Sequence, residues 1–249
     1  MLHYRRAGSG PTIVLLHGFM GGSGYWQPLI GSWSDAFDVV APDLPGFAGS
    51  AGEAPCTSIA GMAQRVLTLL DDIGVAEFIL IGHSMGGMVA QELAAMAANR
   101  VAKLVLYGTG STGVLPGRFE SIQTSISRLR QDGVAATARR IAATWFVAGS
   151  DAPGYAMCLT AGEGTTIEAA AAALEALQGW DGRSQLQRLR MPVLVVAGDR
   201  DRSCTPARAF ELWEGIDGCE LFMLPNCAHA AHLEASELFG MGVRRFMDR

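Results

Sequence analysis

Residues 78–88 read FILIGHSMGGM, a short apolar run that ends in a Gly-x-Ser-x-Gly pentapeptide. Apolar residues at helical spacing follow at Val89, Leu93 and Ala97. This order predicts a buried strand, a sharp turn and a helix. A serine at such a turn is held in a strained conformation that lifts its hydroxyl above the edge of the sheet, and the flanking glycines let the strand and the helix approach closely. Ser84 is therefore the candidate nucleophile.

The pentapeptide alone is a weak signal. In a chain of 249 residues with 31 glycines, such a match arises by chance roughly 0.2 times. The flanking patterns strengthen the signal, because the motif requires a strand before it and a helix after it. The alternative is a glycine-rich turn between a strand and a helix that carries an incidental serine.

The composition indicates a folded chain with a large core, because 49% of the residues are hydrophobic and 17% are charged. The net charge of −5 and the absence of a basic stripe argue against a nucleic-acid or anionic-membrane partner. Neither a signal-peptide pattern nor an apolar run of membrane-spanning length is present. The 5 cysteines lack CxxC spacing and are typical of reduced thiols. We expect a soluble, cytoplasmic protein.

Strand patterns and helix patterns alternate along most of the chain. Alternation of this kind predicts a mainly parallel sheet that helices cover on both faces. Strands are expected at 2–6, 12–16, 37–41, 78–81, 101–107, 192–197 and 219–224, and helices at 25–33, 59–73, 89–97, 206–213 and 235–247.

The segment from about 108 to 190 breaks this alternation. It contains no strand-like run, and its helical stretches are broken by glycines. The expected helices are marked by Phe119, Ile122, Ile126 and Leu129, by residues 134–145 and by an alanine-rich stretch at 167–177. Because the segment is too long for an ordinary connection between strands, we interpret it as a cap over the sheet.

Polar side chains follow the carboxyl ends of several predicted strands, which is where a parallel sheet places functional residues. HGF follows one strand at 17–19, GDRD follows another at 198–201, and NCAH follows the last strand at 226–229. Together with Ser84, these segments supply a serine, an acid and a histidine in that order along the chain. These residue types indicate nucleophilic catalysis, because a serine hydroxyl needs a base and the base needs a carboxylate to orient it.

The order of these segments resembles the α/β-hydrolase superfamily over nearly the whole chain. In that family the nucleophile, the acid and the histidine follow one another in this order. The resemblance implies an α/β fold with a mainly parallel eight-stranded sheet, helices on both faces and an all-helical cap insert. The expected division is a hydrolase core of residues 1–109 and 190–249 and a helical cap of residues 110–189.

The same resemblance implies the roles of individual residues. Ser84, Asp201 and His229 match the family's triad, with Asp201 chosen because it lies three residues after a glycine, as in the family's acid turn. The HGF segment is similar to the family's His-Gly oxyanion loop. The backbone amides of Phe19 and Met85 are therefore the expected oxyanion donors.

Other residues compete for these roles. Asp199 is the alternative acid and is otherwise a turn or surface residue. His232 is the alternative to His229, and otherwise lines the pocket or caps a helix. His17 is expected to shape the oxyanion loop, and His83 to pack beside the serine turn.

A metal site built from Cys204, Cys227, His229 and His232 is a further alternative. The sequence has no HExxH motif, and the cysteines are better interpreted as small loop or core fillers. We therefore expect neither a metal nor a cofactor.

Aromatic and basic residues of the cap allow two interpretations each. Trp145, Phe146 and Trp180 either line the substrate cavity or hold the cap helices together, as large aromatic residues usually do. Trp145 is the candidate substrate-binding residue. The cap arginines either recognise a substrate carboxylate or form solvated helix faces; they are Arg118, Arg128, Arg139, Arg140 and Arg183.

A serine nucleophile predicts hydrolysis of a small carboxylic ester or lactone through an acyl-serine intermediate. Relatives that act on epoxides or haloalkanes use an aspartate in its place, so the serine argues against those activities. The cap is loosely similar to that of enol-lactone hydrolases. The alternatives are a C–C bond hydrolase of aromatic ring-cleavage products and a non-catalytic ligand-binding protein. We expect a small-molecule partner and a monomer or homodimer, with no nucleic acid or membrane.

Overall fold

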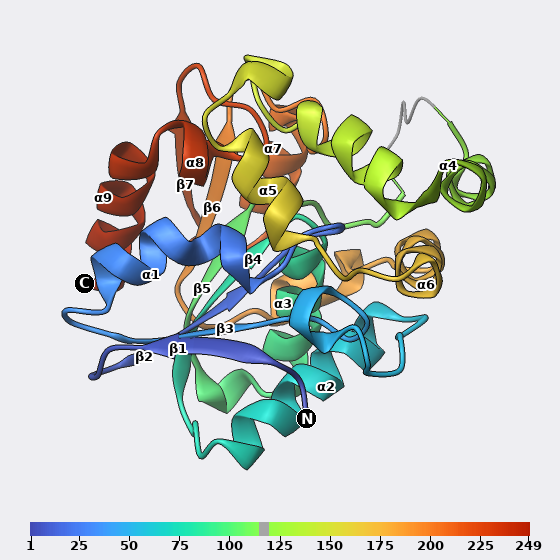
Figure 1. The fold of residues 1–249 in the computed structure, drawn as a ribbon. Helices are drawn as coiled ribbons and strands as arrows, with labels where there is room; N and C mark the ends of the chain where they lie inside the picture. The colour runs from blue at the N-terminus through green and yellow to red at the C-terminus, as the bar shows by residue number, and fades with distance from the viewer. Residues whose placement is uncertain (115–119) are drawn as a thin grey trace.

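A sheet of seven strands forms the centre of the molecule in this computed structural model, which describes residues 1–114 and 120–249. The strand order is β1-β3-β2-β4-β5-β6-β7 (Figure 1), with β1 antiparallel to β3 and all other neighbours parallel. The strands are β1 (Tyr4–Ala7), β2 (Thr12–Leu16), β3 (Asp38–Pro42), β4 (Phe78–His83), β5 (Val101–Tyr107), β6 (Val193–Gly198) and β7 (Glu220–Leu224).

The mainly parallel α/β sheet is confirmed, but it has one strand fewer than the eight that the family resemblance implied. Gly8 and Gly10 both adopt positive φ, at 90° and 115°, and turn the chain from β1 directly into β2. No additional strand therefore lies between these two in the described chain.

Both faces of the sheet are buried at its inner strands β2, β4 and β6, which explains why these strands are apolar almost without interruption. On β2, Ile13 and Leu15 belong to one hydrophobic cluster, whereas Val14 and Leu16 belong to the other. The first cluster includes side chains of α1 (Gln27–Trp33) and α9 (Ser236–Met247); the second includes side chains of α2 (Ile59–Asp72), α3 (Met85–Met96) and α7 (Pro206–Gly215).

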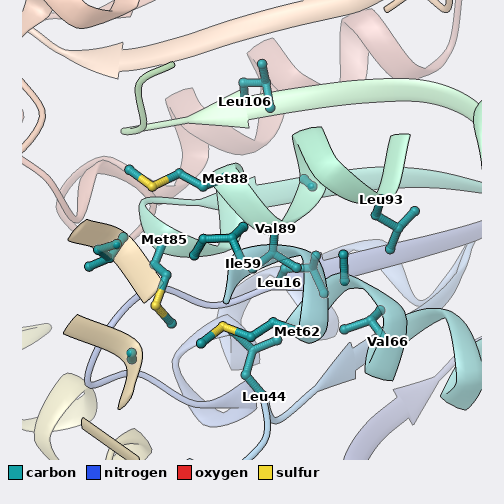
Figure 2. Close-up of a cluster of buried hydrophobic side chains, with 14 of the residues drawn as sticks. Leu16, Leu44, Ile59, Met62, Val66, Met85, Met88, Val89, Leu93 and Leu106 are labelled. Atoms are coloured by element: carbon teal, nitrogen blue, oxygen red, sulfur yellow. The ribbon is translucent and has the colours of Figure 1, made fainter. Parts of the chain in front are cut away.

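Helices α2 and α3 pack against each other on one face of the sheet. Ser58 begins α2 by accepting a hydrogen bond from the Gly61 amide at 3.1 Å. Figure 2 shows Met62 and Val66 of α2 together with Val89 of α3 in one buried cluster. This packing supports α3, the helix that directly follows the candidate nucleophile.

The described residues between β5 and β6 form helices, as the missing strand pattern predicted. They are α4 (Ile122–Ala143), η4 (Gly149–Asp151), α5 (Tyr155–Ala161), α6 (Ile167–Gln178) and η5 (Arg183–Arg188). Gly133, with φ 79° and ψ 169°, interrupts α4, so that it corresponds to two of the expected helices. Helix α5 was not expected, and the part of the first predicted helix that includes Phe119 lies outside the described residues.

Two backbone hydrogen bonds join the beginning and the end of this helical segment. The Gly182 amide donates to the Ser111 carbonyl at 2.8 Å, and the Gly113 amide donates to the Trp180 carbonyl at 3.0 Å. Figure 1 shows α4 and α6 together on one side of the molecule, away from α1 and α9. The boundaries of the cap at 110 and 189 stay a prediction. The remaining short helices are η1 (Ser23–Trp26), η2 (Ala48–Ser50), η3 (Ala98–Arg100) and α8 (Ala231–Glu234).

Candidate active site

Ser84 lies between β4 and α3 in the strained turn that the pentapeptide predicted. Its φ of 55° and ψ of −120° are rare for a residue with a side chain and cost on the order of 1–3 kcal/mol. The Ser84 amide donates to the Tyr107 carbonyl at 2.9 Å, and the Thr109 hydroxyl donates to the Ser84 carbonyl at 2.7 Å. These two bonds attach the turn to the end of β5 and to the residues that directly follow it. Ser84 is half-buried, whereas the residues on either side of it are buried.

Two glycines of the pentapeptide are required by close backbone contacts. A Cβ atom on Gly82 would lie 2.3 Å from the Gly86 carbonyl oxygen. A Cβ atom on Gly86 would lie 2.4 Å from the carbonyl oxygen of Leu16, at the end of β2. Side chains at these positions would push α3 away from β4 and β2.

Asp201 and His229 form a buried pair after β6 and β7. The His229 Nδ1 atom lies 2.7 Å from Asp201 Oδ2. The other carboxylate oxygen accepts hydrogen bonds from the amides of Ser203 at 2.7 Å and Cys204 at 2.9 Å. An ionised carboxylate only accepts hydrogen bonds, so His229 carries its proton on Nδ1. Its Nε2 atom is then left as the acceptor that a base requires.

The imidazole of His229 lies beside the serine turn. Its ring centroid is 4.5 Å from that of His83, the residue directly before Ser84. A Cβ atom on Gly108, at the end of β5, would lie 3.3 Å from His229 Nδ1. Asp199, the alternative acid, instead accepts a hydrogen bond from the Cys227 amide at 3.2 Å. The structure thus brings Asp201, and not Asp199, to the histidine.

The loop after β2 is held by the imidazole of His17. His17 Nδ1 lies 2.8 Å from the Gly18 carbonyl oxygen, and its Nε2 accepts from the Leu44 amide at 2.8 Å. Because a carbonyl only accepts, Nδ1 carries the proton. Burial lowers the pKa of His17, which keeps the imidazole neutral. The Gly18 carbonyl belongs to the same peptide unit as the Phe19 amide, so His17 orients this candidate donor.

The second candidate donor, the Met85 amide, is at the first position of α3. The amides of Gly87 and Met88 both donate to the Ser84 carbonyl, at 2.9 and 3.3 Å. No acceptor for the Met85 amide is present among the described backbone contacts, as is usual in the first turn of a helix. The positive end of the helix dipole lies at the same place.

His232, the alternative base, is enclosed in the core and does not contact a carboxylate. Its ring lies 4.8 Å from Trp26 and 5.0 Å from Tyr25, and 1% of the residue is exposed. Burial and, to a smaller extent, the nearby His229 lower the pKa of His232 to about 3. The structure thus places His232 in the aromatic packing beneath the site, and not beside a carboxylate.

Trp145 joins the cap to the loop of His229. Its ring lies 6.2 Å from the His229 ring, and its carbonyl accepts from the Ala230 amide at 2.8 Å. Glu234 binds both sides of this junction, accepting from the amides of Val147 at 2.7 Å and Ala228 at 2.6 Å. Trp180 lies elsewhere, where its indole donates to Glu92 at 2.7 Å. Of the two tryptophans, only Trp145 is near the candidate site.

Three of the cap arginines pair with carboxylates of the cap itself. Arg128 pairs with Glu120 at 3.1 Å, Arg140 with Asp132 at 3.0 Å, and Arg183 with Asp181 at 2.5 Å. Arg118 lies outside the described residues. These pairs favour the interpretation of the arginines as helix-surface residues.

The described residues contain no group of His, Cys, Asp and Glu side chains that would hold a metal ion. Both cysteines considered for such a site, Cys204 and Cys227, are buried, and burial raises the pKa of the Cys227 thiol to about 11. Within the same described residues, no helix has the length and apolarity needed to cross a bilayer.

Comparison with known proteins agrees with the fold. Residues 11–236 match the family model of the alpha/beta hydrolase fold, and the chain belongs to this family. It is 30% identical over 258 residues, 99% of this chain and 96% of the relative, to a protein of Agrobacterium fabrum that is named as a carbamate hydrolase. It is 27% identical over 257 residues, 96% of this chain and 88% of the relative, to 2-hydroxy-6-oxo-6-phenylhexa-2,4-dienoate hydrolase of Comamonas testosteroni.

A solved structure extends this similarity to the whole chain. The enol-lactonase from Burkholderia xenovorans LB400 superposes with a TM-score of 0.91 at 28% sequence identity, covering 100% of this chain and 96% of that one. The names of these relatives agree in describing hydrolases. The chain is therefore a hydrolase of this family.

Sequence reasoning missed three residues that support the site. Tyr25 and Tyr107 were assigned only to a helix pattern and a strand pattern, and the contacts of Glu234 were not foreseen. Each has a hydrogen-bond partner more than 50 residues away in the sequence, as in the bond between Tyr107 Oη and the His229 carbonyl at 2.8 Å. A local sequence pattern carries no signal for such contacts.

Proposed function

We propose that the protein is a serine hydrolase that cleaves a small carboxylic ester or lactone through an acyl-serine intermediate. One observation carries the proposal: a buried Asp201–His229 pair lies beside a serine that is held in a strained strand-to-helix turn. The carboxylate oxygen that does not face His229 accepts hydrogen bonds from two backbone amides. Ser84, Asp201 and His229 are the proposed catalytic residues. This arrangement assigns one task to each side chain.

In the proposed mechanism, His229 Nε2 removes the proton of the Ser84 hydroxyl as its oxygen attacks the substrate carbonyl. Asp201 stabilises the imidazolium that forms. The carbonyl oxygen becomes negative, and the amides of Phe19 and Met85 donate hydrogen bonds to it, each contributing about 3 kcal/mol to lowering the barrier. The imidazolium then gives its proton to the leaving alkoxide. A water molecule repeats these steps and releases the carboxylic acid.

The ester and lactone class is supported by the enol-lactonase neighbour and by the serine itself. A C–C bond hydrolase is the second candidate, because one relative with nearly full-length similarity is named as 2-hydroxy-6-oxo-6-phenylhexa-2,4-dienoate hydrolase. A non-catalytic binding protein is the third, and it would have no use for the Asp201–His229 pair. We also propose that Trp145 contacts the substrate, and that the protein works in the cytoplasm, where its 5 free cysteines stay reduced.

A substrate panel separates these candidates. Purified protein and a Ser84→Ala variant are assayed on nitrophenyl esters, lactones and vinylogous diketones. We expect turnover of esters or lactones by the wild type and none above background by the variant. Turnover of the diketones alone would replace the proposal by the C–C hydrolase. Tight ligand binding by both proteins without any turnover would favour the binding protein.

A further inference from the structure

A chain of buried hydrogen bonds links the two loops that flank Ser84. The amide of Gly18, in the oxyanion loop (residues 17–22), donates to Tyr25 Oη at 2.8 Å. Tyr25 Oη lies 3.0 Å from His83 Nδ1, and His83 Nε2 lies 3.0 Å from the carbonyl oxygen of His229. These hydrogen bonds thus connect the oxyanion loop, which carries the proposed donor Phe19, with the backbone of the proposed base, His229.

The direction of each hydrogen bond in this chain is determined. The His229 carbonyl only accepts, so His83 must carry its proton on Nε2. A neutral imidazole then has an acceptor at Nδ1, and the single proton of the Tyr25 hydroxyl must point to it. The Tyr25 oxygen remains free to accept from Gly18. Burial, together with nearby His229 and His232, lowers the pKa of His83 well below its ordinary value, which keeps the imidazole neutral.

The chain is enclosed by aromatic rings. Tyr25 and His83 are each 2% exposed, and the His83 ring stacks on Tyr107 at 4.5 Å. Tyr107 also donates to the His229 carbonyl, at 2.8 Å, but among the described hydrogen bonds it does not reach the oxyanion loop. The connection between the two loops therefore depends on Tyr25 and His83.

We propose that Tyr25 and His83 form a positioning relay, which fixes the oxyanion loop and the loop of His229 relative to each other around Ser84. The inference rests on the proposed function and adds two residues to it. Neither residue touches the reacting atoms. Their effect arises because oxyanion donors and a base act only when they are held in place before the reaction.

The relay predicts a specific pattern among variants. Tyr25→Phe removes both hydroxyl bonds while keeping the ring, and His83→Leu removes both imidazole bonds. His83→Gln retains an amide donor with a reach similar to that of Nε2, and should retain more activity than His83→Leu. Tyr155→Phe is the matched control, because its hydroxyl donates only to the Arg139 carbonyl of the cap, at 3.2 Å.

The test measures the kinetics of labelling by a fluorophosphonate, together with thermal unfolding of each variant. For Tyr25→Phe we expect the maximal labelling rate to fall about 10- to 100-fold, with probe affinity within about twofold of wild type, because misplacing the reacting groups slows the step and not the binding. The control should label at the wild-type rate. An unchanged maximal rate in Tyr25→Phe would overturn the relay, and so would equal rates for His83→Gln and His83→Leu.

A second measurement does not depend on activity. In wild-type protein with ¹⁵N-labelled histidine, NMR reports which ring nitrogen of each imidazole carries the proton. The relay requires the Nε2–H tautomer for His83, whose signal is assigned by its loss in His83→Gln. An Nδ1–H tautomer would overturn the relay. If wild type shows this Nε2–H signal but is never labelled, the proposed function fails while the hydrogen-bond chain stands.

Discussion

The core side of the site and the cap side are held together in different ways. In the core, directional hydrogen bonds fix the polar groups of the site, as at Asp201, where both carboxylate oxygens have partners. In the cap, α6 packs through a run of small buried side chains, Ala169–Ala173. Hydrogen-bonded groups tolerate little displacement, whereas apolar packing tolerates substitutions that conserve volume. For the proposed function we therefore expect the core to set the chemistry and the cap to tolerate more substitution.

The largest effect among substitutions that keep the nucleophile is expected at the acid. In Asp201→Asn, the amide nitrogen faces His229 Nδ1 and forces the proton onto Nε2, so that the histidine cannot accept a proton from Ser84. Ester turnover should fall about 10³- to 10⁴-fold. Asp199→Asn is the control, expected within about twofold of wild type. If the two variants lost activity equally, the assignment of the acid would be wrong.

A smaller loss is expected where the core and the cap meet. The Glu234 carboxylate accepts hydrogen bonds from the backbone amides of Val147 and Ala228. In Glu234→Gln, one of these amides faces a side-chain N–H donor instead and loses its acceptor. The segment of Trp145 should loosen from the loop of His229, and kcat/KM for a nitrophenyl ester should fall about tenfold. Wild-type kcat/KM in this variant would show that the junction does not position the site.

Acid should destabilise the core, because its buried histidines must stay neutral. Burial lowers the pKa of His17, His83 and His232, whereas the unfolded chain takes up protons near the ordinary pKa of about 6.5. The unfolded state therefore binds more protons below pH 6.5, and stability is lost as the pH falls. His232, whose pKa burial lowers to about 3, should alone cost about 1 kcal/mol at pH 5.5. Urea unfolding at pH 7.5 and 5.5 measures this loss, and equal stability at both values would contradict it.

The smallest effect is expected in the cap. Trp145→Phe keeps an aromatic ring near His229 but removes part of the surface that we propose contacts the substrate. The ratio of kcat/KM values for a long and a short nitrophenyl ester should change by less than about tenfold, because pocket contacts of this size discriminate weakly. A large fall in turnover of both esters would instead assign Trp145 to the catalytic machinery.

Sequence patterns predicted the fold well where chemistry and packing are local. The pentapeptide around Ser84 implied the strained turn, and the apolar strands implied a sheet buried on both faces. The expected eighth strand came from the family resemblance and not from these residues, whose patterns predicted the seven strands of the structure. Helix α5 was missed because its 7 residues, between Gly154 and Gly162, are too few to show a helical period.

The candidate site could be predicted as a set of residues but not as a geometry. The position of Asp201 three residues after a glycine selected the acid that the structure brings to His229. The relay through Tyr25 and His83 was not predicted. One of its hydrogen bonds joins residues that are 58 positions apart in the sequence, and another joins residues that are 146 positions apart. Such contacts depend on how the strands are ordered in the sheet, which local periodicity does not encode.

The central claim is that Ser84 is an activated nucleophile. Its most direct test is reaction of the wild type and of Ser84→Ala with a fluorophosphonate, followed by the mass of the intact protein. We predict one adduct on the wild type, located at Ser84, and none on the variant. An adduct on both proteins would place the nucleophile elsewhere, and a wild type that stays unmodified by probes small enough to pass the cap would contradict the account.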